Sequence, residues 1–94
     1  MNALFDSVKQ RVTILGSTGS IGVSTLAVIA SHPQRFEVFA LTAATQTEAL
    51  LQQCIQFHPL FAVMASEAPG RQLEQQRKDL CLRTRVQWGG QAIA

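Results

Sequence analysis

Three glycines spaced three residues apart mark the part of the sequence best suited to bind a phosphate. Gly16, Gly19 and Gly22 lie in the stretch ILGSTGSIGVSTLAVIA, residues 14–30. Glycine permits a tight turn and lets a bound group approach the backbone closely. If a helix begins within this stretch, its first amides lack partners and its dipole places partial positive charge there. A pyrophosphate could therefore bind to backbone amides and nearby hydroxyl groups without any charged side chain.

The glycine spacing matches neither of two common phosphate-binding motifs. It is G-x-x-G-x-x-G, whereas the dinucleotide fingerprint is G-x-G-x-x-G, and no Lys-Ser or Lys-Thr pair follows as in a P-loop. Two interpretations stay open. The loop binds a dinucleotide, or its glycines only allow a strand and a helix to pack. A strand before the loop and a helix after it favour the first interpretation.

The segments around the loop alternate between strand and helix patterns. Short apolar, β-branched runs predict strands, and longer segments that end at Pro or Gly predict helices. Strands are predicted at residues 11–15, 36–43, 60–64 and 84–88, and helices begin at Ser20, Thr45 and Glu67. The order β-α-β-α-β-α-β predicts an α/β fold, a Rossmann-like doubly wound parallel sheet with right-handed crossovers.

The position of the last strand in this sheet follows from its side chains. Arg85 and Gln87 interrupt its apolar run, whereas a central parallel strand is apolar on both faces. We therefore expect it at an outer position beside the third strand. One edge of the first strand would then be unpaired, so the isolated chain is expected to be marginally stable and to self-associate.

Local signals predict how the helices begin and end. His32 and His58 each precede a proline and are expected to end the first and second helices, as dipole partners rather than as ligands or bases. Thr45 and Glu48 match a capping box, and Ser66 is a possible cap for the third helix.

The composition is that of an ordinary globular domain, or of part of a larger one. The chain has 94 residues, of which 47% are hydrophobic and 15% charged, with a formal net charge of +2. This charge is too small to indicate nucleic acid or an anionic membrane as a partner. The sequence contains neither a membrane-spanning apolar stretch nor a signal-peptide pattern, which predicts a cytoplasmic protein. Cys54 and Cys81 form no metal or disulfide pattern and are expected to be reduced core residues.

The end of the second strand bears on the choice of cofactor. NAD-specific sites tend to place an acid there, about 20 residues beyond the glycines, to bind the ribose 2′-hydroxyl. Residues 42–47 read TAATQT, with no acid before Glu48. This favours NADP, although no Arg or Lys is present to bind its 2′-phosphate. Thr45 and Gln46 could only hydrogen-bond it.

The sequence resembles the N-terminal part of the 1-deoxy-D-xylulose 5-phosphate reductoisomerase family. The motif ILGSTGSIGVSTL carries the resemblance, which continues through HPQRFEVFALTA, QCIQFHP and FAVM and more faintly through RVQWGGQAIA. Residues 1–10 precede the first predicted strand and are expected to form a leader. Residues 11–94 would form the N-terminal portion of an NADPH-binding domain, without the metal- and substrate-binding and C-terminal domains.

The resemblance also implies a function and a set of cofactor contacts. The family isomerises 1-deoxy-D-xylulose 5-phosphate and reduces the product with NADPH to 2-C-methyl-D-erythritol 4-phosphate, in non-mevalonate isoprenoid biosynthesis. It uses a divalent cation, Mg or Mn, and the full-length protein is expected to be a homodimer. The phosphate contacts carry over to Thr18, Gly19, Ser20 and Ile21, and the contacts to the adenosine ribose and 2′-phosphate carry over to Ala44, Thr45 and Gln46.

Two features of the family pattern are missing from this sequence. The basic residue of the second cluster is absent, and the Asp and two Glu that hold the metal would lie downstream, so we expect no catalytic or metal-binding residue in this chain. It would then be an inactive part of an oxidoreductase, a stand-alone nucleotide-binding module, or a truncated remnant that binds nothing.

Gly19 is expected to require positive φ, which a β-branched residue would resist.

Overall fold

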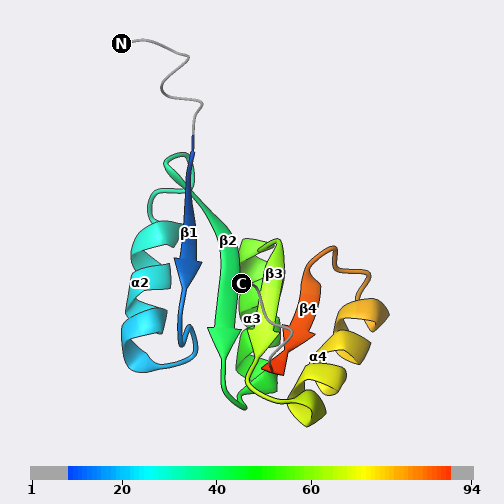
Figure 1. The fold of residues 1–94 in the computed structure, drawn as a ribbon. Helices are drawn as coiled ribbons and strands as arrows, with labels where there is room; N and C mark the ends of the chain where they lie inside the picture. The colour runs from blue at the N-terminus through cyan, green and yellow to red at the C-terminus, as the bar shows by residue number, and fades with distance from the viewer. Residues whose placement is uncertain (1–8, 90–94) are drawn as a thin grey trace, which may run out of the picture.

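Four strands and three helices alternate along residues 9–89, which the computed structural model describes (Figure 1). The elements are β1 (Gln10–Ile14), α2 (Ser20–Ala30), β2 (Phe36–Ala43), α3 (Thr47–Phe57), β3 (Phe61–Met64), α4 (Glu67–Asp79) and β4 (Arg85–Trp88). This order confirms the predicted α/β fold. The predicted leader at residues 1–10 falls almost entirely outside the described residues.

The four strands form one parallel sheet in the order β1-β2-β3-β4. Leu41 of β2 pairs with Ile14 on one side and with Ala62 on the other, and Ala62 pairs in turn with Val86. The predicted outer position of β4 beside β3 is confirmed. β1 forms the opposite edge, and within residues 9–89 no strand pairs with its outer side.

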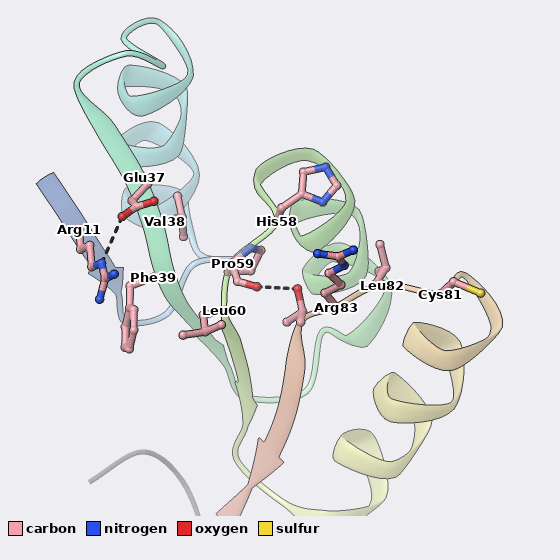
Figure 2. A pocket seen from close by; sticks show the side chains of 11 residues that line it. Arg11, Glu37, Val38, Phe39, His58, Pro59, Leu60, Cys81, Leu82 and Arg83 are labelled. Carbon is pink, nitrogen blue, oxygen red and sulfur yellow. Dashed lines mark hydrogen bonds and ion pairs between the residues drawn. The ribbon is translucent and has the colours of Figure 1, made fainter. Parts of the chain in front are cut away.

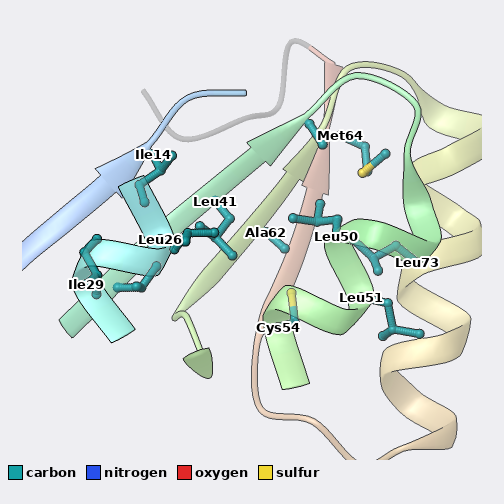
Figure 3. Close-up of a cluster of buried hydrophobic side chains, with 12 residues drawn as sticks. Ile14, Leu26, Ile29, Leu41, Leu50, Leu51, Cys54, Ala62, Met64 and Leu73 are labelled. Carbon is teal, nitrogen blue, oxygen red and sulfur yellow. The ribbon is translucent and has the colours of Figure 1, made fainter. Parts of the chain in front are cut away.

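The three helices contribute to one apolar core. Because each strand lies beside its predecessor, right-handed crossovers place all the helices on the same face of the sheet. Figure 3 shows side chains from every helix meeting those of the strands in one cluster. The buried cluster consists of Ile14, Leu26, Ile29, Val38, Leu41, Ala43, Leu50, Leu51, Cys54, Ala62, Met64 and Leu73.

A bulge in β2 changes which of its side chains face the core. Val12 pairs with Val38, but the next residue, Thr13, pairs with Ala40, so Phe39 is the extra residue. Strict alternation would place Val38 and Leu41 on opposite faces. With the bulge between them, both belong to the core cluster.

The capping box predicted for α3 is wrong. The helix begins at Thr47 with Gln46 as its N-cap, and no side chain caps it. Thr45 lies one residue too early, where its carbonyl accepts a bond from the amide of Thr47 at 2.8 Å. Ser66 does occupy the N-cap position of α4, but its side chain makes no capping bond.

The helix ends predicted from the two His-Pro pairs are confirmed. α2 ends at Ala30, and α3 ends at Phe57. His58 follows α3 in the left-handed conformation, with φ 50°, and its amide donates to the carbonyl of Cys54 at 2.9 Å.

The prediction for the cysteines is confirmed for Cys54 and wrong for Cys81. Cys54 is buried in the core, and this burial raises its thiol pKa to about 12. Cys81 is exposed with φ 56° because it follows α4 in a Schellman turn. Its amide donates to the carbonyl of Lys78, and the amide of Leu82 donates to that of Arg77.

Most of the charged side chains on α4 pair with one another. Arg71 pairs with Glu67, and Arg77 pairs with Glu74 through two bonds of 2.8 Å. The bond from Arg77 holds the pKa of the Glu74 carboxyl below its usual value. None of the helices in residues 9–89 has the length and apolar character needed to cross a bilayer.

Candidate functional site

Two turns meet at the edge of the sheet where the strands end. The first turn joins β1 to α2 and the second joins β2 to α3; both lie toward the bottom of Figure 1. β1 and β2 are parallel neighbours, so the turns that follow them are adjacent. In doubly wound sheets, ligands bind outside the carboxyl ends of the strands.

The three glycines of the first turn differ in what the fold requires of them. Gly16 has φ +66°, a conformation that favours glycine. Gly22 packs against the turn: a Cβ there would collide with the carbonyl oxygen of Gly16 and lie 2.6 Å from Cα of Ser17. Gly19 has φ −78°, so the expectation of positive φ at this residue is wrong. A Cβ on Gly19 would meet only the Gly16 oxygen, at an ordinary 3.4 Å. The fold thus requires Gly16 and Gly22, but not Gly19.

Backbone amides of the first turn divide into two groups. Those of Gly16 and Ser17 donate to the side-chain and main-chain oxygens of Thr42, at 2.9 and 2.8 Å. Those of Thr18, Ser20 and Ile21 find no acceptor among residues 9–89. They are therefore free to donate to a ligand.

The start of α2 carries no group that would compete with an anion. The helix has no side-chain cap and no acidic residue in its first turn. Its unpaired amides and its dipole favour negative charge there. Thr18 is half-buried, while Gly19, Ser20 and Ile21 are exposed.

The second predicted cluster forms the turn between β2 and α3. Ala44, Thr45 and Gln46 are all exposed, and none carries a charge. Ala44 lines a hollow of about 400 Å³ together with Gly16, Thr42, Ala43, Val63, Met64, Ala65 and Gly89. Thr45 and Gln46 do not line this hollow. Ser20 and Ile21 line a separate shallow depression along α2.

The first turn has the features needed to bind the phosphates of a dinucleotide, whereas the second turn lacks a charged group for the 2′-phosphate on the ribose. The free amides beside Gly19 suit a pyrophosphate, and the hollow between Gly16 and Ala44 extends from that turn across the ends of β2 and β3. No positive side chain belongs to the second cluster, so a 2′-phosphate would receive only neutral hydrogen bonds from Thr45 and Gln46.

The larger cavity in the described part of the chain lies elsewhere. It measures about 620 Å³ and is lined by residues at the starts of the strands and in the turns before them, among them Arg11, Phe39, His58 and Arg83 (Figure 2). It lies at the amino ends of the strands, whereas the glycine turn follows the carboxyl end of β1. Doubly wound folds bind nucleotides at the carboxyl ends of their strands. We therefore place the candidate site at the smaller hollow.

Two polar residues that support the first turn were missed by the sequence analysis. Thr42 lies at the end of β2, and Gln53 on α3 makes two hydrogen bonds to Ser17. A polar residue within the otherwise apolar end of β2 was the available signal for Thr42. For Gln53, the signal was a polar residue directly before the buried Cys54.

The sheet and its glycine turn define this chain as a Rossmann-like α/β unit of the nucleotide-binding type, with its helices on one face as in one half of a doubly wound sheet. The family model for 1-deoxy-D-xylulose 5-phosphate reductoisomerase matches residues 12–94, and the chain belongs to this family.

Similar proteins agree with this assignment in sequence and in structure. The chain is 51% identical over 84 residues to the 1-deoxy-D-xylulose 5-phosphate reductoisomerase of Aromatoleum aromaticum, which covers 89% of this chain and 21% of that protein. A crystal structure of DOX-P reductoisomerase with NADPH, fosmidomycin and magnesium matches 86% of this chain and 20% of its own, with a TM-score of 0.82 at 40% identity.

A second solved structure gives the same result. The enzyme of Zymomonas mobilis in complex with NADPH matches 87% of this chain and 21% of its own, with a TM-score of 0.81 at 30% identity. The chain thus spans about a fifth of the length of the relatives that it matches.

Proposed function

We propose that residues 11–94 are the N-terminal portion of the NADPH-binding domain of a 1-deoxy-D-xylulose 5-phosphate reductoisomerase. One observation carries the proposal: the start of α2 presents amides that find no acceptor within residues 9–89, beside Gly19, a glycine that the fold does not need. The absence of a side chain there leaves room for a bound group. Solved relatives that contain NADPH support the choice of ligand.

In this proposal the two turns bind different parts of the cofactor. The amides of Thr18, Ser20 and Ile21 donate to the pyrophosphate, and Gly19 lets it approach the backbone. Ala44, Thr45 and Gln46 contact the adenosine ribose and its 2′-phosphate. When bound, NADPH supplies the hydride for the reduction step.

The complete protein is proposed to convert 1-deoxy-D-xylulose 5-phosphate to 2-C-methyl-D-erythritol 4-phosphate with a divalent cation, Mg or Mn. No three His, Cys, Asp or Glu residues gather within residues 9–89. In this proposal the metal- and substrate-binding residues lie in other domains. By itself the 94-residue chain would bind the cofactor without turnover. A cytoplasmic homodimer without nucleic-acid or membrane partners is the expected form of the whole protein.

A calorimetric titration with NADPH tests the binding part of the proposal. The chain should bind NADPH, and Gly19→Val should weaken binding at least about tenfold, because its side chain would fill the space beside the free amides. Ala30→Val, at the far end of α2, is the matched control and should bind as the parent does. Equal binding by both variants would reject the site, and no binding by the parent would favour a remnant without a ligand.

A chimera tests the enzymatic part. Residues 12–94 would replace the matching segment of the Aromatoleum aromaticum reductoisomerase. We expect the chimera to oxidise NADPH in the presence of 1-deoxy-D-xylulose 5-phosphate, and to lose this activity with Gly19→Val. A folded chimera that binds NADPH without turnover would instead support the stand-alone binding module.

A further inference from the structure

We propose that Gln53 is a positioning residue of the nucleotide site, which clamps the glycine turn from α3 and holds its free amides in place. Gln53 lies well away from the turn in sequence and is not among the residues expected to contact the cofactor. Its role in binding rests on the proposed function, whereas the clamp itself rests on the geometry of this chain alone.

The clamp consists of two reciprocal hydrogen bonds to one residue. The hydroxyl of Ser17 donates to Oε1 of Gln53 at 2.6 Å, and Nε2 of Gln53 donates to the carbonyl of Ser17 at 2.8 Å. Ser17 is fully buried, and Gln53 is half-buried. Turning the Gln53 amide over would set its oxygen against the Ser17 carbonyl, so the two bonds fix its orientation.

A third bond completes the polar contacts of Ser17. Its amide donates to the carbonyl of Thr42 at 2.8 Å, while the amide of the preceding Gly16 donates to the Thr42 hydroxyl at 2.9 Å. The turn is therefore held by β2 on one side and by α3 on the other. Because every polar group of Ser17 is bonded, this buried residue leaves no unsatisfied group beside the site.

The clamp has two consequences for an anion site. First, Gln53 engages the Ser17 carbonyl, which belongs to the same planar peptide unit as the free amide of Thr18, and so fixes the direction of that amide. Second, Gln53 belongs to the helix that directly follows Ala44–Gln46. Gln53 thereby links the turn that would bind the pyrophosphate to the turn that would contact the ribose. Holding both turns in place before the ligand arrives lowers the entropy cost of binding.

Three variants of the 94-residue chain separate positioning from simple packing. Gln53→Met keeps the volume and removes both bonds. Gln53→Glu keeps the shape and the acceptor for the Ser17 hydroxyl, but sets a carboxylate against the Ser17 carbonyl. Gln52→Met makes the same change as the first variant at the exposed neighbouring position and is the matched control.

Two measurements are made on each variant, and they give independent results. Calorimetry with NADPH reports affinity, and hydrogen exchange reports protection of the Gly16 and Ser17 amides. We expect both Gln53 variants to bind NADPH about tenfold more weakly and to exchange these two amides about tenfold faster. Core amides such as that of Ala62 should exchange as in the parent, and Gln52→Met should change nothing.

The outcomes distinguish failure of the clamp from failure of the proposed function. Unchanged exchange at Gly16 and Ser17 in folded Gln53 variants would overturn the clamp. Faster exchange with unchanged NADPH affinity would overturn its positioning role. If the parent binds no NADPH, the proposed function fails, while the exchange data still decide whether the clamp exists. Should Gln53→Met unfold, Gln53→Glu and Ser17→Ala supply the same test, because each keeps at least one of the polar partners.

Discussion

The first two helices occupy equivalent places in successive crossovers, yet they differ at their starts and on their surfaces. Neither helix has a side-chain cap, but α3 carries Glu48 in its first turn, whereas α2 has no acidic residue there. A carboxylate at that position stabilises a helix through its dipole. α3 has this stabilisation, and α2 leaves the same position open. This difference supports the proposal that the start of α2 binds an anion from outside the chain.

The two helices also differ in how much apolar surface they expose. α3 buries Leu50, Leu51 and Cys54, and its one large apolar side chain among the exposed residues, Ile55, is 38% exposed. α2 buries Leu26 and Ile29 but leaves Ile21 83% exposed and Val28 58% exposed. Leu15, which directly follows the edge strand β1, is 79% exposed. The helix of the second crossover exposes less apolar surface, whereas the first crossover presents an apolar surface typical of an interface.

The largest effect is expected from a substitution that disrupts the packing of α2 against the glycine turn. Gly22→Val should lower the free energy of unfolding by about 3 kcal/mol, because the new side chain collides with the backbone of Gly16 and Ser17. Gly19→Val is the comparison and should cost about 1 kcal/mol or less, since space is open there. Urea denaturation measures both. Equal losses would mean that the two glycines serve the fold alike.

A substitution that makes the start of α2 resemble that of α3 should raise the stability of the chain and weaken its binding of NADPH. Ser20→Glu places a carboxylate in the first turn of α2, which should stabilise the chain by about 0.3 to 1 kcal/mol. The same charge repels a phosphate, so NADPH binding should weaken at least about tenfold. Ser31→Glu adds this charge at the opposite end of α2 and should leave affinity unchanged. Undiminished binding by Ser20→Glu would contradict the difference drawn between the two helices.

The turn before α3 can be given the charge that it lacks. Thr45→Lys should strengthen NADPH binding by about 1 to 3 kcal/mol through a charged hydrogen bond to the 2′-phosphate. NADH, which has no 2′-phosphate, serves as the control and should gain nothing. Because the Thr45 side chain caps no helix, stability should stay close to that of the parent. An equal gain for both cofactors would show that this residue does not contact the 2′-phosphate.

The exposed surface of the first crossover should make the chain self-associate. Sedimentation of the isolated chain is expected to show oligomers, and Val28→Lys should weaken association about fivefold, or about 1 kcal/mol. Gln52→Lys on α3 adds the same charge to an exposed position and should have no effect. A monodisperse monomer of ordinary domain stability would contradict this account of β1 and α2.

Sequence patterns predicted the elements well because their signals are local. Apolar runs, the glycines and the two His-Pro pairs each act within a few residues, and the polar residues of β4 placed it at an edge. The capping box at Thr45 failed because the N-cap of α3 is Gln46, one residue later than the pattern suggested. Such a shift depends on how β2 ends, which a short motif does not record.

The residues that support the candidate site could not be predicted from the sequence, because they lie far from the glycine turn along the chain. Thr42 and Gln53 reach the turn from 26 and 36 residues away in sequence. These contacts depend on the pairing of β1 with β2, including the bulge at Phe39, and on the rotation of α3. The division of roles among the three glycines also required coordinates. Spacing alone does not distinguish the glycine that bends the backbone, Gly16, from the one that leaves space, Gly19.

The central claim is that the start of α2 binds the phosphates of NADPH. The most direct test is a titration of the ¹⁵N-labelled chain with NADPH, followed by the amide chemical shifts. The account predicts the largest changes at Thr18, Ser20 and Ile21, smaller changes at Ala44–Gln46, and none at His58 or Arg83 beside the larger cavity. Changes confined to that cavity, or no change anywhere, would contradict it.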